Sequence, residues 1–331
     1  MNAKPMLVLL LSSLAVGCAA TDEENAPTTS EEAELREVRC EGLSSVPGMT
    51  TARLDVDGGR VHLRYGVMPA KGTAQGDVFY LPGFADRLDN HLPLFEAWSK
   101  AGFRVVSFDY PSHGESCGRP LDCYGFEDLG RFADAVERHT HEATRPFVLS
   151  GWSTGGLVAV RTLQESWLTR RVDGVVLYAP AVAPRAVVGE LGFVTEGTLT
   201  RNPSPPHRGP ITPKTPLATP LFAPKLLLNG ALARGATYPK VPTMVVLGGD
   251  DTDRYVDSHG VASWIADVER SGGRIEGRRC IGGYHELDNE PAPMGPAVRS
   301  ASSDFAGWIA GGGRDKMPTS VTGNDAACAA F

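Results

Sequence analysis

At residues 147–159 the chain reads Phe-Val-Leu-Ser-Gly-Trp-Ser-Thr-Gly-Gly-Leu-Val-Ala. A short apolar run leads into Gly-x-Ser-x-Gly, and small and apolar residues follow at helical spacing, so we expect a strand, a sharp turn and a helix. Gly151 and Gly155 have no Cβ, which lets the backbone pass close to both sides of Ser153. This geometry lifts a serine hydroxyl above the end of a sheet, and we therefore predict that Ser153 is a nucleophile. The alternative is an ordinary serine in a tight turn between a strand and a helix.

Outward from this stretch, short buried strands alternate with amphipathic helices. Strands are expected at 77–81, 103–108, 172–178, 243–247 and 274–281, helices at about 90–101, 125–142, 258–271 and 296–309, and a β-hairpin at 51–57 and 61–67. This alternation predicts an α/β fold with a mostly parallel central sheet that helices cover on both faces. In such sheets the functional site lies at the carboxyl ends of the strands, which is where the turn at Ser153 is expected.

The alternation stops between about residues 183 and 240, a Pro-rich stretch that contains ten Pro. Within it only 217–232 has a helical pattern. A long insertion inside a compact domain is usually functional, so we expect a cap over the site. We further expect apolar side chains of this cap to line a pocket for an acyl chain, namely Leu217, Leu221, Phe222, Leu226, Leu227 and Leu228. The alternative is a solvent-exposed loop with no functional role.

The first residues have the pattern of an export signal. Lys4 precedes an apolar run at 6–16 that is too short to span a bilayer comfortably. The run ends in Leu14-Ala15-Val16-Gly17-Cys18, which resembles a bacterial lipobox. We therefore expect Cys18 to be lipidated, and plain secretion with cleavage near Ala20 is the alternative.

These features predict how the chain is divided. Residues 1–18 form the signal peptide, and residues 19–38, rich in Glu, Thr and Ala, form a flexible acidic tether. A single domain is expected from 39 to 311, followed by a loose C-terminal tail from 312 to 331. The protein is expected to be exported, as a bacterial membrane-anchored lipoprotein or otherwise as a secreted or periplasmic protein.

Export implies an oxidising compartment, in which cysteines can pair. Cys117 and Cys123 lie close together in the sequence and are the first expected disulfide. Cys280 with Cys328 is the second candidate, which leaves Cys40 unassigned. No Cys or His spacing fits a zinc site, and we expect neither a metal nor an organic cofactor. The net charge of −7 and the scattered basic residues predict no nucleic-acid partner.

A serine hydroxyl needs a base within hydrogen-bond reach and a group that orients this base. On a sheet of this kind the acid and then the histidine follow the serine along the chain. His285 stands directly after the last expected strand and is the predicted base. The acid is expected in the turn after the strand at 243–247, where Asp250, Asp251 and Asp253 compete.

Several segments resemble the monoacylglycerol lipase and lysophospholipase group of α/β-hydrolases, which is often classed with the serine aminopeptidase (S33-type) hydrolases. They are Leu81-Pro82-Gly83-Phe84, Phe108-Asp109-Tyr110-Pro111-Ser112-His113-Gly114-Glu115-Ser116, Gly151-Trp152-Ser153-Thr154-Gly155-Gly156, Asp253-Arg254-Tyr255-Val256-Asp257 and Tyr284-His285-Glu286-Leu287. The resemblance runs from about residue 75 to 310 and implies the α/β-hydrolase fold with a catalytic triad.

The resemblance also assigns individual roles. It selects Asp253 as the acid, because the family places its acid directly before an Arg and a Val-Asp pair. It implies that the backbone N–H of Phe84 joins that of Thr154, the residue after the nucleophile, in an oxyanion hole. Trp152 and Pro82 stand where the family has His, and neither position has a role in the triad.

Together these features predict a serine hydrolase that cleaves carboxylic esters of acyl lipids through an acyl-enzyme. The resemblance implies a monoacylglycerol or a lysophospholipid as the substrate, and the apolar, basic and acid-poor insertion suits an acyl chain with an anionic head group, such as a lysophospholipid. An aminopeptidase of the S33 type is the alternative among enzymes, and it would need carboxylates in the cap to bind a free amine. A non-catalytic α/β-hydrolase that acts as a surface binding module is the alternative from another class.

Overall fold

The computed structural model describes residues 38–185, 196–209, 211, 218–318 and 328–330. Within these residues the strands are β1 (Thr50–Val56), β2 (Val61–Met68), β3 (Gly76–Leu81), β4 (Phe103–Phe108), β5 (Cys117–Gly118), β6 (Phe147–Trp152), β7 (Gly174–Tyr178), β8 (Thr243–Leu247), β9 (Ile275–Cys280) and β10 (Cys328–Ala330). They form one sheet in the order β1-β2-β4-β3-β6-β7-β8-β9-β10, with β5 paired to β2. The strands from β4 to β9 in this order run parallel, and the strands outside them pair antiparallel.

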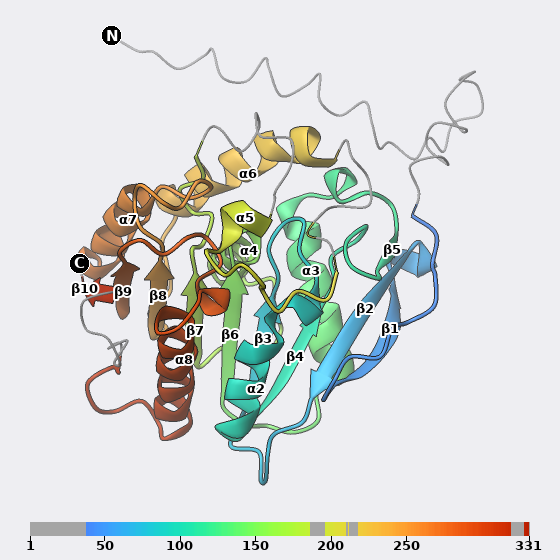
Figure 1. Cartoon of the computed structure of the whole chain (residues 1–331), viewed down its shortest axis with the longest axis horizontal. Coiled ribbons are helices and arrows are strands. Elements are labelled where there is room, and N and C mark those ends of the chain that lie inside the picture. Colours follow the sequence, from blue (N-terminus) through green and yellow to red (C-terminus); the bar gives the residue numbers. More distant parts are fainter. Residues whose placement is uncertain (1–37, 186–195, 210, 212–217, 319–327, 331) are drawn as a thin grey trace.

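The longer helices cover the sheet or lie above it. They are α2 (Leu92–Lys100), α3 (Phe126–Thr140), α4 (Thr154–Glu165), α6 (Ala218–Gly235), α7 (Ser258–Arg270) and α8 (Met294–Ala310), and α5 (Glu196–Leu199) is a single turn. Figure 1 shows α2 and α8 in front of the sheet and α3 and α4 behind it. None of the helices in the described part of the chain is long and apolar enough to cross a membrane.

The expected mostly parallel sheet with helices on both faces is confirmed. Each of the expected strands is present, with bounds that differ by at most two residues from those predicted. The central strands β3, β4, β6, β7 and β8 are buried at every position, as parallel strands covered on both faces should be. The expected amphipathic pattern of α3 is also confirmed, because its apolar residues at helical spacing are buried, namely Phe126, Leu129, Phe132, Ala133 and Val136.

The insertion contributes α5 and α6, and Figure 1 shows α6 lying across the top of the molecule, over the carboxyl ends of the strands. Pro224 stands inside α6 without ending the helix. The described parts of the insertion therefore lie where a cap was expected. The signal peptide, Cys18 and the tether as far as residue 37 lie outside the described residues.

Two expectations for the outer strands are corrected by the structure. Cys117 pairs with Cys40 and not with Cys123, because Val38 and Gly118 exchange backbone hydrogen bonds and hold the two segments side by side. The C-terminal residues 328–330 are not a loose tail, since they form β10 at the edge of the sheet.

The second candidate disulfide is present. Cys280 of β9 and Cys328 of β10 face each other in the antiparallel register and are bonded, with their Cα atoms 3.9 Å apart. The disulfide and the strand pairing therefore anchor the end of the chain to the sheet.

Candidate active site

The turn at Ser153 joins β6 directly to α4. Its backbone has φ 54° and ψ −117°, a strained conformation for a residue with a side chain. A Cβ built on Gly155 would lie 2.1 Å from the carbonyl oxygen of Leu81, so only glycine fits at that position. The expected strand, sharp turn and helix are thus all present, and they place the serine at the carboxyl end of the sheet.

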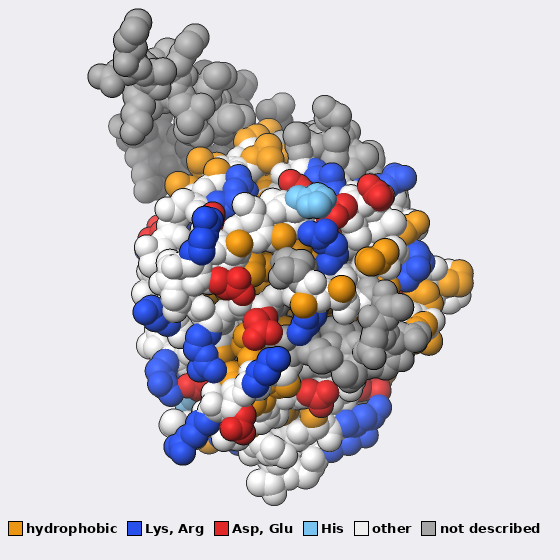
Figure 2. Space-filling view, turned by 90° about the vertical axis from the view of Figure 1, so that its left-hand side faces the viewer, with side chains coloured by type: hydrophobic (Ala, Val, Ile, Leu, Met, Phe, Trp, Pro, Cys, Tyr) orange, Lys and Arg blue, Asp and Glu red, His pale blue; other side chains and the backbone are white. Residues whose placement is uncertain are grey.

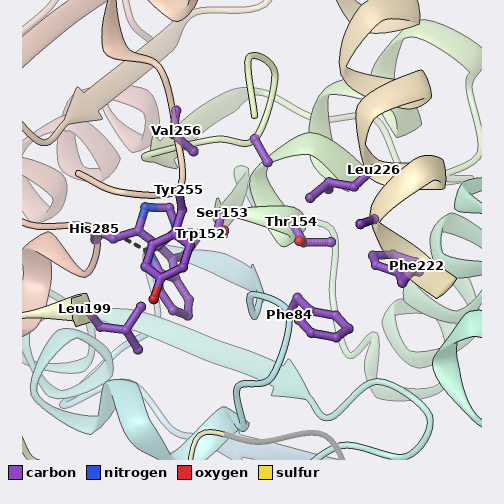
Figure 3. Close-up of a pocket in the computed structure, with 12 residues that line it drawn as sticks. Phe84, Trp152, Ser153, Thr154, Leu199, Phe222, Leu226, Tyr255, Val256 and His285 are labelled. Atoms are coloured by element: carbon purple, nitrogen blue, oxygen red, sulfur yellow. Dashed lines mark hydrogen bonds between the residues drawn. The ribbon is translucent and has the colours of Figure 1, made fainter. Parts of the chain in front are cut away.

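Ser153, His285 and Asp253 form one chain of hydrogen bonds. The Ser153 Oγ lies 2.7 Å from His285 Nε2 (Figure 3), and His285 Nδ1 lies 3.0 Å from Asp253 Oδ2. Because a carboxylate only accepts, the ring proton is on Nδ1, which leaves Nε2 to accept the serine hydroxyl. His285 and Asp253 are 2% and 3% exposed. This is the arrangement of a nucleophile, a base and an orienting acid.

The three carboxylates in the turn after β8 have different surroundings. Asp253 Oδ1 accepts from two backbone N–H groups at 2.9 and 3.0 Å, which fixes this carboxylate towards His285. Asp250 is bound elsewhere, since its Oδ2 lies 2.8 Å from Arg279 Nη1. Asp251 is exposed. The structure therefore brings Asp253, and neither of its rivals, to the imidazole.

Two aromatic side chains hold the imidazole of His285 in place. Trp152 Nε1 donates to the carbonyl oxygen of His285 at 2.9 Å, and the two rings lie 5.2 Å apart. The ring of Tyr255 lies 4.9 Å from the imidazole, and its hydroxyl is hydrogen-bonded to Thr198 of α5. The sequence predicts an altered pocket floor at Trp152, which replaces the family's His, and assigns no role to Tyr255. The Trp next to the nucleophile, where the family has His, is the sequence feature that indicates a role for Trp152. No sequence pattern indicates that Tyr255 packs against the imidazole.

Phe84 and Thr154 both line the cavity beside Ser153, on the side away from His285 (Figure 3). Thr154 is the first residue of α4, and N–H groups in a first helical turn have no partner within the helix. Phe84 follows β3, and Ala85 directly after it has a strained backbone with φ 63°. Both residues therefore border the cavity at Ser153, and their role in an oxyanion hole remains a prediction.

A small cavity of about 40 Å³ opens onto Ser153. Apart from Ser153, Thr154 and His285, its lining is apolar or aromatic, made by Phe84, Trp152, Ala181, Leu199, Phe222, Ala223, Leu226, Tyr255 and Val256. Typical ligand pockets are larger, roughly 300 Å³ or more. An acyl chain of more than a few carbons would fit only after part of this lining moved.

The inner face of α6 closes the cavity. Phe222 and Leu226 both line it, and the Phe222 ring stacks between the rings of Phe84, at 5.4 Å, and Phe126, at 5.7 Å. Phe84 also packs edge-on against the buried ring of His113, which is 5.3 Å away. The stack therefore fixes how far the cavity extends away from the serine.

The outer face of α6 is apolar as well. Leu221, Leu227 and Leu228 are 39%, 38% and 40% exposed, so the expectation that they line the pocket is wrong. They lie on the side of the helix that faces away from the cavity, and Figure 2 shows hydrophobic side chains at the top of the molecule, where α6 lies. Leu217, the remaining member of the expected lining, lies outside the described residues.

A buried cluster of acids and histidines lies behind the site. His91 Nε2 is 2.8 Å from Asp86 and His91 Nδ1 is 2.8 Å from Asp288, so this imidazole donates from both ring nitrogens. Burial lowers the pKa of His91, but the charges of Asp288 and Asp86 outweigh burial and hold the pKa well above its ordinary value. His91 therefore ties the loop after Phe84 to the loop after His285. Among the described residues no group of His, Cys, Asp or Glu has the arrangement of a metal site.

Comparison with known families and structures agrees with this geometry. Residues 72–203 match the Hydrolase_4 family, described as serine aminopeptidase, S33. No curated protein sequence matches the chain. A solved lipase in its open form is similar, with a TM-score of 0.61 and 17% identity over 79% of this chain and 99% of that one.

Two monoglyceride lipases are also similar in structure. A soluble variant of the Saccharomyces cerevisiae enzyme, in complex with a substrate analogue, has a TM-score of 0.61 and 15% identity over 84% of this chain and 100% of that one. The Paleococcus ferrophilus monoacylglycerol lipase has a TM-score of 0.58 and 21% identity over 75% of this chain and 98% of that one. At such identities the likeness establishes the fold, and it confirms the expected α/β-hydrolase fold.

Proposed function

Starting from the α/β-hydrolase fold, we propose that this protein hydrolyses carboxylic esters of acyl lipids. The observation that carries the proposal is the hydrogen-bonded chain of Ser153, His285 and Asp253 at the floor of an apolar cavity. The likeness to monoglyceride lipases supports an ester substrate.

In this reaction His285 takes the proton from Ser153 as the serine oxygen attacks the ester carbonyl. Asp253 keeps the imidazole in the correct tautomer and stabilises the imidazolium that forms. The N–H groups of Phe84 and Thr154 face the developing oxyanion, and donors of this kind contribute about 10²- to 10³-fold each. His285 then protonates the leaving alcohol, and water releases the acyl group from Ser153 by the same steps.

An acyl ester fits the cavity better than an aminoacyl substrate does. An aminopeptidase must bind a free ammonium group, for which a carboxylate close to the reacting carbonyl is the natural partner. No Asp or Glu is among the cavity-lining side chains in the described part of the chain. The lining instead offers apolar surface, as an acyl chain requires.

Two basic residues of the insertion, Arg201 and Lys225, are held by contacts within the fold, which favours a substrate with a neutral head group. Arg201 is paired with Glu290, and Lys225 donates to the backbone carbonyls of Asp122 and Tyr124. These cations are already engaged within the fold, so they do not stand ready for a phosphate. Within the expected pair of substrate classes, we therefore propose the monoacylglycerol type over the lysophospholipid type.

We also propose that the enzyme acts outside the cytoplasm, anchored by a lipid on Cys18. The proposal rests on the lipobox-like sequence, and the disulfides Cys40–Cys117 and Cys280–Cys328 are consistent with an oxidising compartment. Such an anchor would place the cavity close to membrane lipids. Mass spectrometry of the mature N-terminus tests it, and a terminus other than an acylated Cys18 would refute it.

Substrate profiling tests the catalytic proposal. We expect hydrolysis of p-nitrophenyl acyl esters and of monoacylglycerol, little hydrolysis of aminoacyl anilides, and labelling by a fluorophosphonate probe. Ser153→Ala should abolish the labelling and lower kcat by about 10⁶-fold, because the members of a triad act as a unit. A folded wild-type protein that neither reacts with the probe nor cleaves any ester would be a binding module instead.

A further inference from the structure

The insertion is tied by polar contacts to the loop that carries the base. These contacts come from residues 199–208, which we call the strap. The backbone N–H of Glu286 donates to the carbonyl oxygen of Leu199 at 2.7 Å, and Arg201 Nε donates to Glu290 Oε2 at 2.7 Å. The strap therefore lies directly on the residues that follow the catalytic imidazole.

His207 is the strap residue that reaches into the buried cluster behind the site. Its Nε2 lies 2.8 Å from Glu286 Oε2, and its side chain is 3% exposed. The other oxygen of Glu286 accepts from Asn289 Nδ2 at 2.9 Å. Because Glu286 directly follows His285, the imidazole of His207 supplies the charge partner of a carboxylate one residue away from the base.

The charges around His207 favour its protonated form. Burial lowers the pKa of His207, but the hydrogen bond and the charge of Glu286 outweigh burial and raise the pKa above its ordinary value. Asp86, from the loop after β3, adds to the rise, and the nearby His91 opposes it. Burial raises the pKa of Glu286, and the hydrogen bond from His207 opposes this rise. The guanidinium of Arg87 lies close to the backbone of Gly209, two residues after His207.

We infer that His207 is a positioning residue, which acts through Glu286 to hold His285 in place for its reaction with Ser153. The inference rests on the proposed function, because it concerns the base of that reaction. The backbone around His285 is held from one side by the indole N–H of Trp152 and from the other by the pair of Glu286 with His207.

The contact between His207 and Glu286 is expected to depend on pH. Because the pKa of His207 is raised in the folded protein, its pair with Glu286 is complete below the ordinary histidine pKa and is lost as the pH rises through the raised value. Loss of that proton removes the closer of two cations from the buried carboxylate of Glu286 and leaves it the imidazole of His91, whose Nε2 lies 3.7 Å from Glu286 Oε1, which weakens the hold on the loop. A misplacement of about 1 Å at a reacting group can cost about 100-fold in rate.

The rate at which a fluorophosphonate labels Ser153 tests the inference, because this probe reports nucleophile activation without an acyl chain in the cavity. At neutral pH we expect His207→Gln, verified as folded by circular dichroism, to react about 10- to 100-fold more slowly than the wild type. The difference in labelling rate between His207→Gln and the wild type should become smaller as the pH is raised, since His207 of the wild type then loses its charge. His62→Gln changes another histidine paired with a carboxylate, on β2 and distant from the site, and should react like the wild type at every pH.

Two results would overturn the inference: equal rates for His207→Gln and the wild type at every pH, or rates slower by one constant factor, which would indicate a purely structural contact. If His207→Gln does not fold, Glu286→Gln takes its place. Its labelling rate should not show the decline at alkaline pH that is expected of the wild type. If neither variant folds, the pH dependence of wild-type labelling tests the inference. A labelling rate that stays constant above neutral pH contradicts it. Failure of the folded wild type to react at all is distinguishable from these results and refutes the proposed function, and with it this inference.

Discussion

The loops that carry the proposed triad and the insertion above them are held in different ways. Ser153 and Asp253 are fixed by backbone hydrogen bonds to the sheet and to their own turns, such as Ser153 N–H to the carbonyl oxygen of Tyr178 and Asp253 N–H to that of Gly249, each at 2.9 Å. Most contacts of the strap involve side chains, among them the ion pairs Arg201–Glu290 and His207–Glu286. A stack of aromatic rings holds α6.

This difference separates two tasks in the molecule. Backbone contacts at strand ends are dictated by the fold, and they place Ser153 and Asp253 without depending on pH. Side-chain contacts are easily altered, so the insertion can adjust how the base is held and how large the cavity is. Substitutions in the core loops should therefore affect the chemical step, and substitutions in α6 should affect the choice of substrate.

After that of Ser153→Ala, the largest effect is expected in the core loops, from Asp253→Asn. An amide in place of the carboxylate favours the wrong tautomer of His285, and the analogous change in a serine protease lowers kcat by about 10⁴-fold. Asp250→Asn is the matched control, because Asp250 is paired with Arg279 and does not contact the imidazole. Hydrolysis of a short p-nitrophenyl ester measures both variants. Full activity of Asp253→Asn together with loss of activity in Asp250→Asn would show that the acid is misassigned.

A smaller effect is expected at the contact between the core and the base loop, from Trp152→Phe. The substitution leaves the buried carbonyl oxygen of His285 without its donor, which costs about 1–3 kcal/mol. Part of that cost should appear as a decrease in kcat of about tenfold. Trp264→Phe is the control, since this buried indole N–H has no hydrogen-bond partner among the described residues. An unchanged kcat in Trp152→Phe would mean that the base loop is held well enough without the indole.

The same difference between backbone contacts and side-chain contacts decides which features the sequence could predict. The strands of the core have clear apolar runs, and the order of serine, acid and histidine along the chain follows from the order of the strand ends. Ser153, Asp253 and His285 could therefore be selected before any coordinates were known, with the family pattern choosing Asp253 over its neighbours. Thr154 follows from its place directly after the nucleophile, whereas Phe84 is assigned by the family resemblance.

The contacts made by side chains could not be predicted, because they depend on neighbours that are distant in the sequence. The apolar residues of α6 have no periodicity that separates an inner from an outer face, so Phe222 and Leu228 look equivalent until the helix is placed. The pairing of Cys117 with Cys40 depends on the bridge between Val38 and Gly118. The buried pair of His207 with Glu286 joins residues 79 positions apart, and no local pattern indicates it.

The smallest effect on rate, and the clearest on selectivity, is expected from Phe222→Ala in α6. Removing this ring from between Phe84 and Phe126 extends the cavity away from Ser153 without touching the triad. A single methylene in a hydrophobic pocket is worth roughly 1–3 kcal/mol, so the ratio of kcat/KM for an octanoyl ester to that for a butyryl ester should rise by about tenfold or more. Leu228→Ala removes an apolar side chain from the outer face of the same helix, where Leu228 is 40% exposed, and should leave this ratio unchanged. If both variants shifted the ratio equally, α6 would act on the substrate as a whole, and the assignment of acyl-chain selection to its inner face would be wrong.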